Sequence, residues 1–127
     1  GELFTEEDLV PDTAKGYMNI PDGELPKFKE GPFAKFPDFR LAVRHWMAYN
    51  TGLGNQGNAE GNVSVSFTVG KDGKAKDAKV ENRETTSSEL EVAALYTIQR
   101  LPEFIPATQN GKPVAFRMTV ALRFENR

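Results

Sequence analysis

The sequence predicts an α+β domain in which two helices pack on one face of a three-stranded antiparallel sheet, in the order helix, strand, strand, helix, strand. Two segments place apolar residues at helical spacing, and three segments alternate apolar with polar residues. The 127 residues suffice for one domain, and 39% hydrophobic with 27% charged residues is a globular composition. We divide the chain into an extended lead-in, residues 1–30, and a compact domain, residues 31–127.

The lead-in and the residues directly after it are rich in amino acids that interrupt regular structure. Proline has no backbone N–H and breaks helices and strands, and glycine favours turns. The residues concerned are Pro11, Pro21, Pro26, Pro32, Gly16, Gly23 and Gly31. This composition predicts an extended segment with a single short strand at residues 16–20.

The first helix is predicted to follow Pro37-Asp38 and to end at Gly52 and Gly54, where a Gly/Asn-rich loop runs to residue 61. Its apolar residues recur at i, i+3, i+4, i+7 and i+8 and form one buried face. They are Phe39, Ala42, Val43, Trp46 and Met47. The single histidine, His45, falls off this face and is predicted to be a surface residue.

A β-hairpin is predicted next, because apolar and polar residues alternate and give its first strand one buried and one polar face. The apolar set is Val63, Val65, Phe67 and Val69, and the polar set is Ser64, Ser66 and Thr68. Asp72-Gly73 is a strong turn signal, since glycine tolerates positive φ. The return strand, residues 74–81, is a weaker prediction.

The second helix is predicted at residues 89–100, with Ser88 and Glu91 in a capping box that binds the first free N–H groups. Its buried face consists of Leu90, Ala94, Ile98 and Leu101, with Ala93 and Thr97 beside them. Pro102 ends the helix. Phe104 and Ile105 are predicted to pack as the chain returns to the sheet.

The last strand follows the turn Asn110-Gly111 and is the longest. Its apolar face consists of Val114, Phe116, Met118, Val120, Leu122 and Phe124, and its other face of Ala115, Arg117, Thr119, Ala121 and Arg123. A right-handed crossover through the second helix places it beside the first strand, in the order second, first, third. The last strand is then a sheet edge. The face away from the helices carries Ser64, Ser66, Thr68, Arg117, Thr119 and Arg123 and suits water or a partner.

Composition argues against several functions. A net charge of −2 disfavours nucleic-acid binding, which usually needs a basic face. Without cysteine there are no disulfides, thiol nucleophiles or zinc-thiolate sites, and one histidine disfavours histidine-based metal or catalytic sites. A small-ligand or hydrolytic domain is disfavoured because no catalytic polar constellation is recognisable. We predict no enzyme activity, no cofactor, no metal, no nucleic acid and no membrane contact by this segment, which begins at Gly1 and is expected to belong to a longer protein.

Three segments resemble one known family, the TonB C-terminal domain. Residues 61–80, with Asp72-Gly73, resemble its hairpin. Residues 101–114 resemble its link to the last strand, where a Pro-x-aromatic-x-Pro run leads into Asn-Gly-Lys-Pro-Val. Residues 26–31 and the first helix match the family more loosely, so that the resemblance covers about residues 26–125. The Tyr-Pro pair that family members often carry after the first helix is absent from residues 50–54.

The resemblance implies a periplasmic, non-catalytic interaction domain in the envelope of a Gram-negative bacterium. TonB proteins are anchored in the inner membrane, and their C-terminal domain binds a short segment of an outer-membrane receptor in energy transduction. An extended receptor peptide is expected to add to the exposed sheet edge, whose unpaired N–H and C=O groups accept another strand. The implied site is the last strand from Val114 to Phe124, with Arg117 and Arg123 steering an acidic partner.

Other interpretations remain open at this point. One is that the chain covers its own edge with residues 17–20. Another is that two copies exchange strands and form a homodimer. The domain would then be a structural or signalling module of the envelope, alone or fused to a sensor or membrane peptidase, that binds no receptor.

Overall fold

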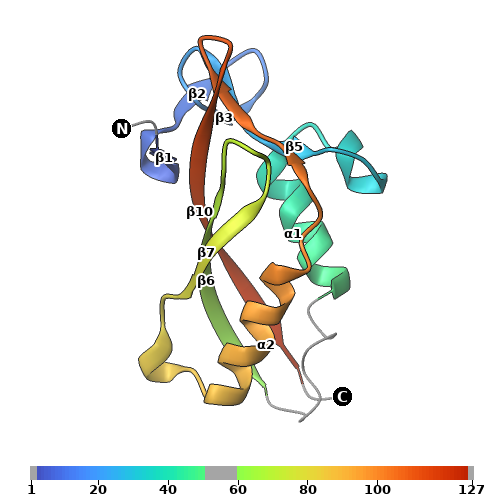
Figure 1. Ribbon diagram of the computed structural model, residues 1–127, viewed down its shortest axis with the longest axis vertical. Helices are drawn as coiled ribbons and strands as arrows, with labels where there is room; N and C mark the ends of the chain where they lie inside the picture. Colours follow the sequence, from blue (N-terminus) through green and yellow to red (C-terminus); the bar gives the residue numbers. More distant parts are fainter. Residues whose placement is uncertain (1–2, 51–59, 126–127) are drawn as a thin grey trace.

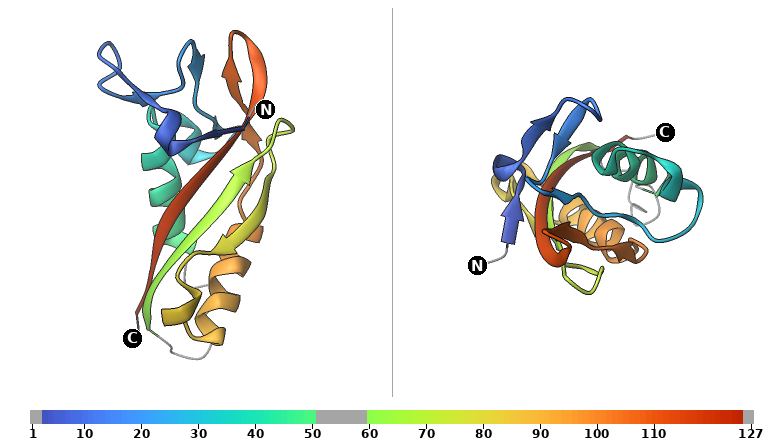
Figure 2. Two further views of the ribbon diagram at one scale, coloured as in Figure 1. Left: turned by 90° about the vertical axis from the view of Figure 1, so that its left-hand side faces the viewer. Right: turned by 90° about the horizontal axis from the view of Figure 1, so that it is seen from above.

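The computed structural model describes residues 3–50 and 60–125 and confirms the α+β fold. Two helices lie on the same side of one curved sheet (Figure 1; right view of Figure 2). The long strands β6 (Gly61–Val69), β7 (Ala75–Val80) and β10 (Lys112–Phe124) are antiparallel, in the predicted order β7-β6-β10. Short strands, which the sequence did not predict, extend this sheet.

The predicted alternation on the two longest strands is confirmed. The buried apolar side chains of β6 and β10 are Val63, Val65, Phe67, Val69, Val114, Phe116, Met118, Val120, Leu122 and Phe124. The register places them on one face, with Val65 opposite Val120 and Phe67 opposite Met118. Because side chains alternate with a period of two, a slip of one residue would expose this whole set.

The first helix, α1 (Phe39–Asn50), buries the five predicted residues and packs against β10. His45 is exposed, as predicted, and its ring stacks on Phe36 with centroids 4.8 Å apart. The predicted helix stop at Gly52 and Gly54, and the loop as far as residue 59, lie outside the described residues.

The second helix, α2 (Ser88–Gln99), packs against β6 and β7 and buries the predicted residues Leu90, Ala93, Ala94, Thr97 and Ile98. Leu101, also predicted for this face, follows the helix and is half-buried. The predicted capping box at Ser88 and Glu91 is wrong, because the N-cap is Ser87, one residue earlier. Ser87 has an extended backbone, and its hydroxyl accepts the N–H of Leu90 at 3.2 Å, whereas Ser88 is already helical. Adjacent serines offer two equivalent caps in the sequence, and the backbone conformation selects one of them.

The lead-in is more structured than predicted. It holds the strands β1 (Leu3–Thr5), β2 (Val10–Asp12), β3 (Tyr17–Asn19), β4 (Gly23–Glu24) and β5 (Lys27–Phe28), with a 3₁₀ turn, η1 (Glu6–Asp8), after β1. Strands β2 and β3 form a hairpin, and β1 pairs in parallel with β10. The prediction of a single strand is therefore wrong, whereas the division at residue 30 stays a prediction.

Two further short strands join the lead-in to the second half of the chain. Strand β8 (Phe104–Ile105) pairs with β5, and β9 (Ala107–Gln109) pairs with both β4 and β10. The turn from β9 into β10 is Asn110-Gly111, as predicted, with φ of 52° and 78° at these residues. A short 3₁₀ turn, η2 (Pro32–Lys35), then leads from β5 towards α1.

Aromatic rings tie these layers together. The Phe104 ring lies 4.7 Å from the ring of Phe28 and 5.5 Å from that of Phe39. Phe39 in turn meets Phe116 of β10 edge-on at 6.3 Å. Ile105, predicted to pack beside Phe104, is instead 41% exposed, because successive side chains of a strand point to opposite faces.

Gly73 holds the tip of the β6–β7 hairpin against β8. Its φ of 82° is favourable for glycine, and its carbonyl accepts the N–H of Phe104 at 2.8 Å. A Cβ atom at this position would lie 2.0 Å from the Phe104 carbonyl oxygen. Glycine is thus required here by backbone conformation and by space.

We predict that Gly73→Ala destabilises the protein more than Gly16→Ala does. Gly16 has a similar φ of 75° with no atom within 4 Å of a built Cβ, so this control measures the left-handed conformation alone, roughly 1–2 kcal/mol. Gly73→Ala adds the clash and the loss of the Phe104 hydrogen bond, for a total of about 3 kcal/mol or more. Urea unfolding of both variants checks this difference, and equal losses would contradict it.

Lys29 of the lead-in is bound to Glu103, the residue before β8. The Lys29 ammonium donates to the Glu103 carboxylate at 2.9 Å, and the Lys29 N–H donates to the Glu103 carbonyl at 3.1 Å. The side-chain hydrogen bond from Lys29 lowers the pKa of Glu103, and the same bond raises the pKa of Lys29. The ion pair therefore favours the folded state between these two pKa values.

We predict that Glu103→Gln lowers the melting temperature more at pH 7 than at pH 3. A lowered carboxyl pKa contributes stability above the ordinary pKa of glutamate, and this contribution is lost as the pH falls through the lowered value. Glu84→Gln is the matched control, because Glu84 is exposed and makes no ion pair in the described part of the chain. Melting curves at both pH values test this, and a pH-independent difference between Glu103→Gln and wild type would contradict it.

Candidate functional site

The predicted site, β10 from Val114 to Phe124, is divided by its partners. Val114 pairs with Ala107 of β9, and residues 115–117 pair with Leu3–Thr5 of β1. From residue 118 to residue 124, β10 pairs with β6, and no other strand among the described residues pairs with this stretch. We call residues 118–124 the free edge of β10.

The expectation that the whole last strand is an open edge is therefore wrong for residues 114–117. Strands β9 and β1 occupy them through pairings that the sequence pattern did not reveal. The alternative in which residues 17–20 cover the edge is also wrong, because β3 pairs with β2 and β1 takes this place. A role of the eleven predicted residues in binding stays a prediction.

The orientation of the backbone on the free edge follows from Ser64. Its carbonyl accepts the N–H of Glu81 at 2.7 Å and its N–H donates to the Asn82 side chain at 2.9 Å, so both groups point away from β10. Backbone groups of neighbouring residues point to opposite sides of a strand, so Val63 and Val65 point towards β10.

The partners of these β6 residues define the other side of β10. Leu122 and Val120, opposite Val63 and Val65, exchange their backbone hydrogen bonds with β6. The residues between them, Thr119, Ala121 and Arg123, consequently direct their N–H and C=O groups away from β6. These three residues present the unpaired hydrogen-bonding groups of the free edge.

The opposite edge of the sheet, β7, is less suited to accept a strand. The ladder with β6 is interrupted between Ser66 and Thr68, and Asp77 has a φ of 54° at this irregularity. Lys76 and Lys79 are exposed on the same strand. Bulges and lysines are two of the ways in which proteins block edge-to-edge pairing.

The polar face of the sheet is less open than predicted. Ser66 and Thr68 are only 2% and 7% exposed, and the half-buried Arg117 lies across them. The guanidinium donates to both hydroxyl groups at 2.8 Å, and the Ser66 hydroxyl donates to the Glu81 carboxylate at 2.5 Å. Thr119 and Arg123 remain exposed, so the outward face is open mainly beside the free edge.

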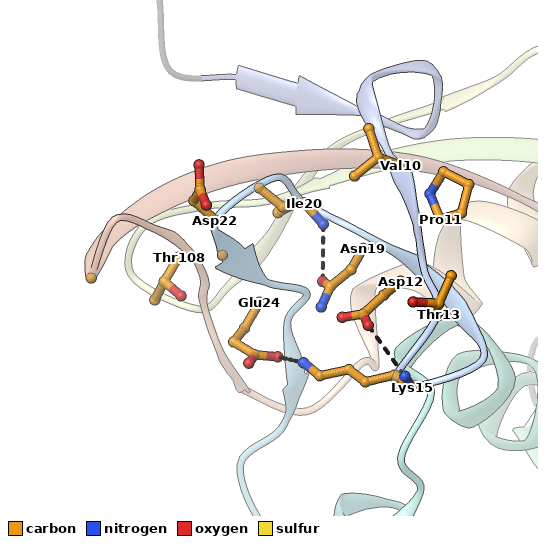
Figure 3. Close-up of a pocket in the computed structure, with 12 residues that line it drawn as sticks. Val10, Pro11, Asp12, Thr13, Lys15, Asn19, Ile20, Asp22, Glu24 and Thr108 are labelled. Carbon is orange, nitrogen blue, oxygen red and sulfur yellow. Dashed lines mark hydrogen bonds and ion pairs between the residues drawn. The ribbon is translucent and has the colours of Figure 1, made fainter.

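A pocket of about 640 Å³ lies between the β2–β3 hairpin and β4, with carboxylates on its lining (Figure 3). The Lys15 ammonium donates to the Glu24 carboxylate, and this hydrogen bond raises the pKa of Lys15. The Asp12 carboxylate accepts the N–H groups of Ala14 and Lys15 at 3.0 and 3.2 Å. Two of the pocket's acids are thus engaged in local folding contacts.

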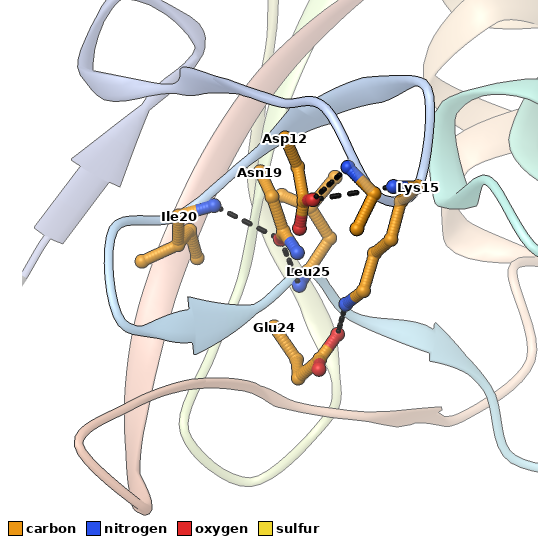
Figure 4. Close-up of polar contacts among 7 residues, drawn as sticks. Asp12, Lys15, Asn19, Ile20, Glu24 and Leu25 are labelled. Carbon is orange, nitrogen blue, oxygen red and sulfur yellow. Dashed lines mark hydrogen bonds and ion pairs between the residues drawn. The ribbon is translucent and has the colours of Figure 1, made fainter.

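Asn19, at the back of this pocket, also has a structural role. Its side-chain oxygen accepts the N–H groups of Ile20 and Leu25 at 2.9 and 3.1 Å, which holds the turn between β3 and β4 (Figure 4). Within residues 3–50 and 60–125, no group of three or more His, Cys, Asp or Glu residues is arranged to hold a metal ion. In the same ranges no helix has the length and apolar character that crossing a membrane requires.

Comparison with known proteins supports one family. The family model described as "Gram-negative bacterial TonB protein C-terminal" matches residues 55–125, which include β6, β7, α2 and β10. A comparison with curated proteins found no match. The family match spans the free edge and β9, but not β1, the lead-in strand that pairs with residues 115–117 of β10.

We predict that Arg117→Met destabilises the fold by about 1–3 kcal/mol, because it leaves two buried hydroxyl groups without their donor. Arg123→Met is the control on the same strand face, since Arg123 is exposed and its loss should change stability by less than about 0.5 kcal/mol. Urea unfolding measures both. Equal effects would mean that the hydroxyl network contributes no stability of its own.

Proposed function

The chain belongs to the family of C-terminal domains of Gram-negative bacterial TonB proteins, and we propose that it binds an extended segment of an outer-membrane receptor by strand addition. The binding is non-catalytic and serves energy transduction across the periplasm. In this proposal the periplasmic location and the link to the proton-motive force rest on family membership. The manner of binding rests on the geometry of β10.

The observation that carries this proposal is the free edge of β10. Thr119, Ala121 and Arg123 direct backbone donors and acceptors away from β6, in a stretch of seven residues, about 23 Å long at the rise of a β-strand. An added strand pairs through main-chain hydrogen bonds, while its side chains supply specificity. A short extended peptide matches this stretch in length and in hydrogen-bonding pattern.

The rigidity of the edge favours binding. Met118, Val120, Leu122 and Phe124 are buried beneath the free edge, and each pairs with a residue of β6. Because these contacts hold the backbone in an extended conformation before a partner arrives, only the partner has to become ordered. Preorganisation of one side lowers the entropic cost of association.

Self-association is a second candidate that uses the same groups. Two copies could pair their free edges antiparallel and form a continuous sheet. Ala121 lies at the centre of the three accessible residues, so a two-fold axis beside it would pair β10 of one copy with β10 of the other. This candidate and receptor binding differ in stoichiometry. Sedimentation of the protein with and without a peptide therefore separates them.

We predict that Ala121→Pro abolishes peptide binding while the fold is retained. Proline removes the N–H that points to the free edge and leaves the ladder with β6 intact, and an edge strand tolerates proline where its N–H faces solvent. Ala121→Val is the matched control, because it changes the side chain and keeps the N–H. The measurement is amide exchange by NMR, with an extended peptide added.

In the wild type and in Ala121→Val, the peptide should slow amide hydrogen exchange at residues 119, 121 and 123. In Ala121→Pro, the backbone spectrum should remain that of a folded protein, with no protection on addition of peptide. Binding that persists in Ala121→Pro at full affinity would contradict strand addition. Protection confined to β7 would place the site on the other edge.

A further inference from the structure

Arginine side chains surround the free edge of β10. Arg117 directly precedes the free edge and Arg123 lies near its far end, both on the strand face that points away from the helices. Helix α1 contributes Arg40 and Arg44, which lie one turn apart on the same flank of the helix. Neither helix residue belongs to the buried face, and the sequence pattern alone assigned them no role.

The flank of α1 that carries Arg40 lies next to η1, which follows the strand paired with the covered part of β10. Glu6 directly follows β1, which is paired with that edge, and its carboxylate lies 3.8 Å from Nε of Arg40. The left view of Figure 2 shows η1 against the upper end of α1, with β10 as the strand nearest to the helix. Phe39, the first residue of α1, meets Phe116 of β10, and the helix and the strand run in the same direction in Figure 1. Residues later in α1, such as Arg44 one turn after Arg40, are therefore further along in the direction of the free edge.

This positive charge is incompletely neutralised. Arg40 and Arg123 have carboxylate neighbours, Glu6 at 3.8 Å and Glu125 at 3.5 Å, in exposed pairs of the kind that contribute little. Arg117 donates to neutral hydroxyl groups, and only through Ser66 does it reach an acid. Arg44 is exposed, and its side chain makes no ion pair or hydrogen bond in the described part of the chain.

We propose that the free edge of β10 selects an extended peptide that carries acidic side chains. This inference rests on the proposed strand addition and specifies the chemistry of its partner. Although the net charge of the chain is −2, arginines flank the free edge of β10, which is better suited to accept a strand than the irregular edge of β7. Such complementarity acts on encounter rate and specificity, and salt weakens it.

The geometry also limits the length of the bound peptide and the positions of its acidic residues. Strand β1 ends at Thr5, opposite Arg117, so that a peptide on the free edge stops beside this pair. Side chains of an added strand alternate between the two faces. Acidic residues on its outer face come near Arg117 and Arg123, and those on its helix face come near Arg44.

The test uses the whole 127-residue chain, labelled with ¹⁵N, and three extended peptides whose other residues are identical and apolar. They differ in two positions, which hold Asp, Asn or Lys. At low ionic strength the Asp peptide should bind about tenfold more tightly than the Asn peptide, and the Lys peptide more weakly than either. Near 1 M salt, where the Debye length is about 3 Å, the three affinities should converge.

Arg44→Gln tests the helix contribution, because this exposed side chain makes no ion pair or side-chain hydrogen bond within residues 3–50 and 60–125 that the substitution would break. The ratio of Asp to Asn affinity should fall by about threefold in this variant. Arg83→Gln is the charge-matched control, since Arg83 is exposed beside α2, where its Nε lies 3.1 Å from Glu91, and the ratio should not change.

The outcomes separate this inference from the proposed function. Equal binding of the three peptides, with protection at Thr119, Ala121 and Arg123, would leave strand addition intact and overturn the acidic preference. A preference that is unchanged by Arg44→Gln together with Arg123→Gln would also overturn it. No protection with any peptide would remove the proposed site, and the inference with it.

Discussion

The hydrogen-bonded ladder between β10 and β6 is the interaction on which the rest of this molecule depends. Its register places every large apolar side chain of both strands on the helix side and so builds the core. The same register decides which backbone groups of β10 are used internally and which point outwards. The packing of the core and the set of outward-pointing backbone groups on β10 are therefore both determined by one ladder.

Local patterns in the sequence predicted the parts of the fold that repeat over many residues. Periodic patterns predicted both helices and the long strands, and glycine-containing turn signals predicted the two tight turns. The order of the strands followed from these elements and the crossover rule. The strands of the lead-in have two or three residues each, too few for a period, and most of their partners lie far along the chain. Strands β1, β4 and β5 depend on a surface, formed by β10, β9 and β8, that no local pattern describes.

The candidate site was predictable only in part, for the same reason. Alternation identified β10 and its outward residues, but it could not show that β1 and β9 would occupy residues 112–117. It also assigned Arg117 to an open polar face, whereas burial of Ser66 and Thr68 required a donor close at hand. The sequence showed only that Arg44 lies outside the apolar face of α1. The placement of that helix beside β10 is what brings Arg44 into the proposal for an acidic peptide.

The parallel pairing of β1 with β10 has a consequence for the order of folding. It joins residues 3–5 to residues 115–117 and so closes the longest loop of the sheet, and the entropic cost of closure rises with the logarithm of loop length. The ladder with β6 spans a shorter loop, and contacts of high sequence separation tend to form slowly. Strand β1 therefore pairs only after β10 has formed. When β1 is synthesised, the edge of β10 that it will cover has not yet been made.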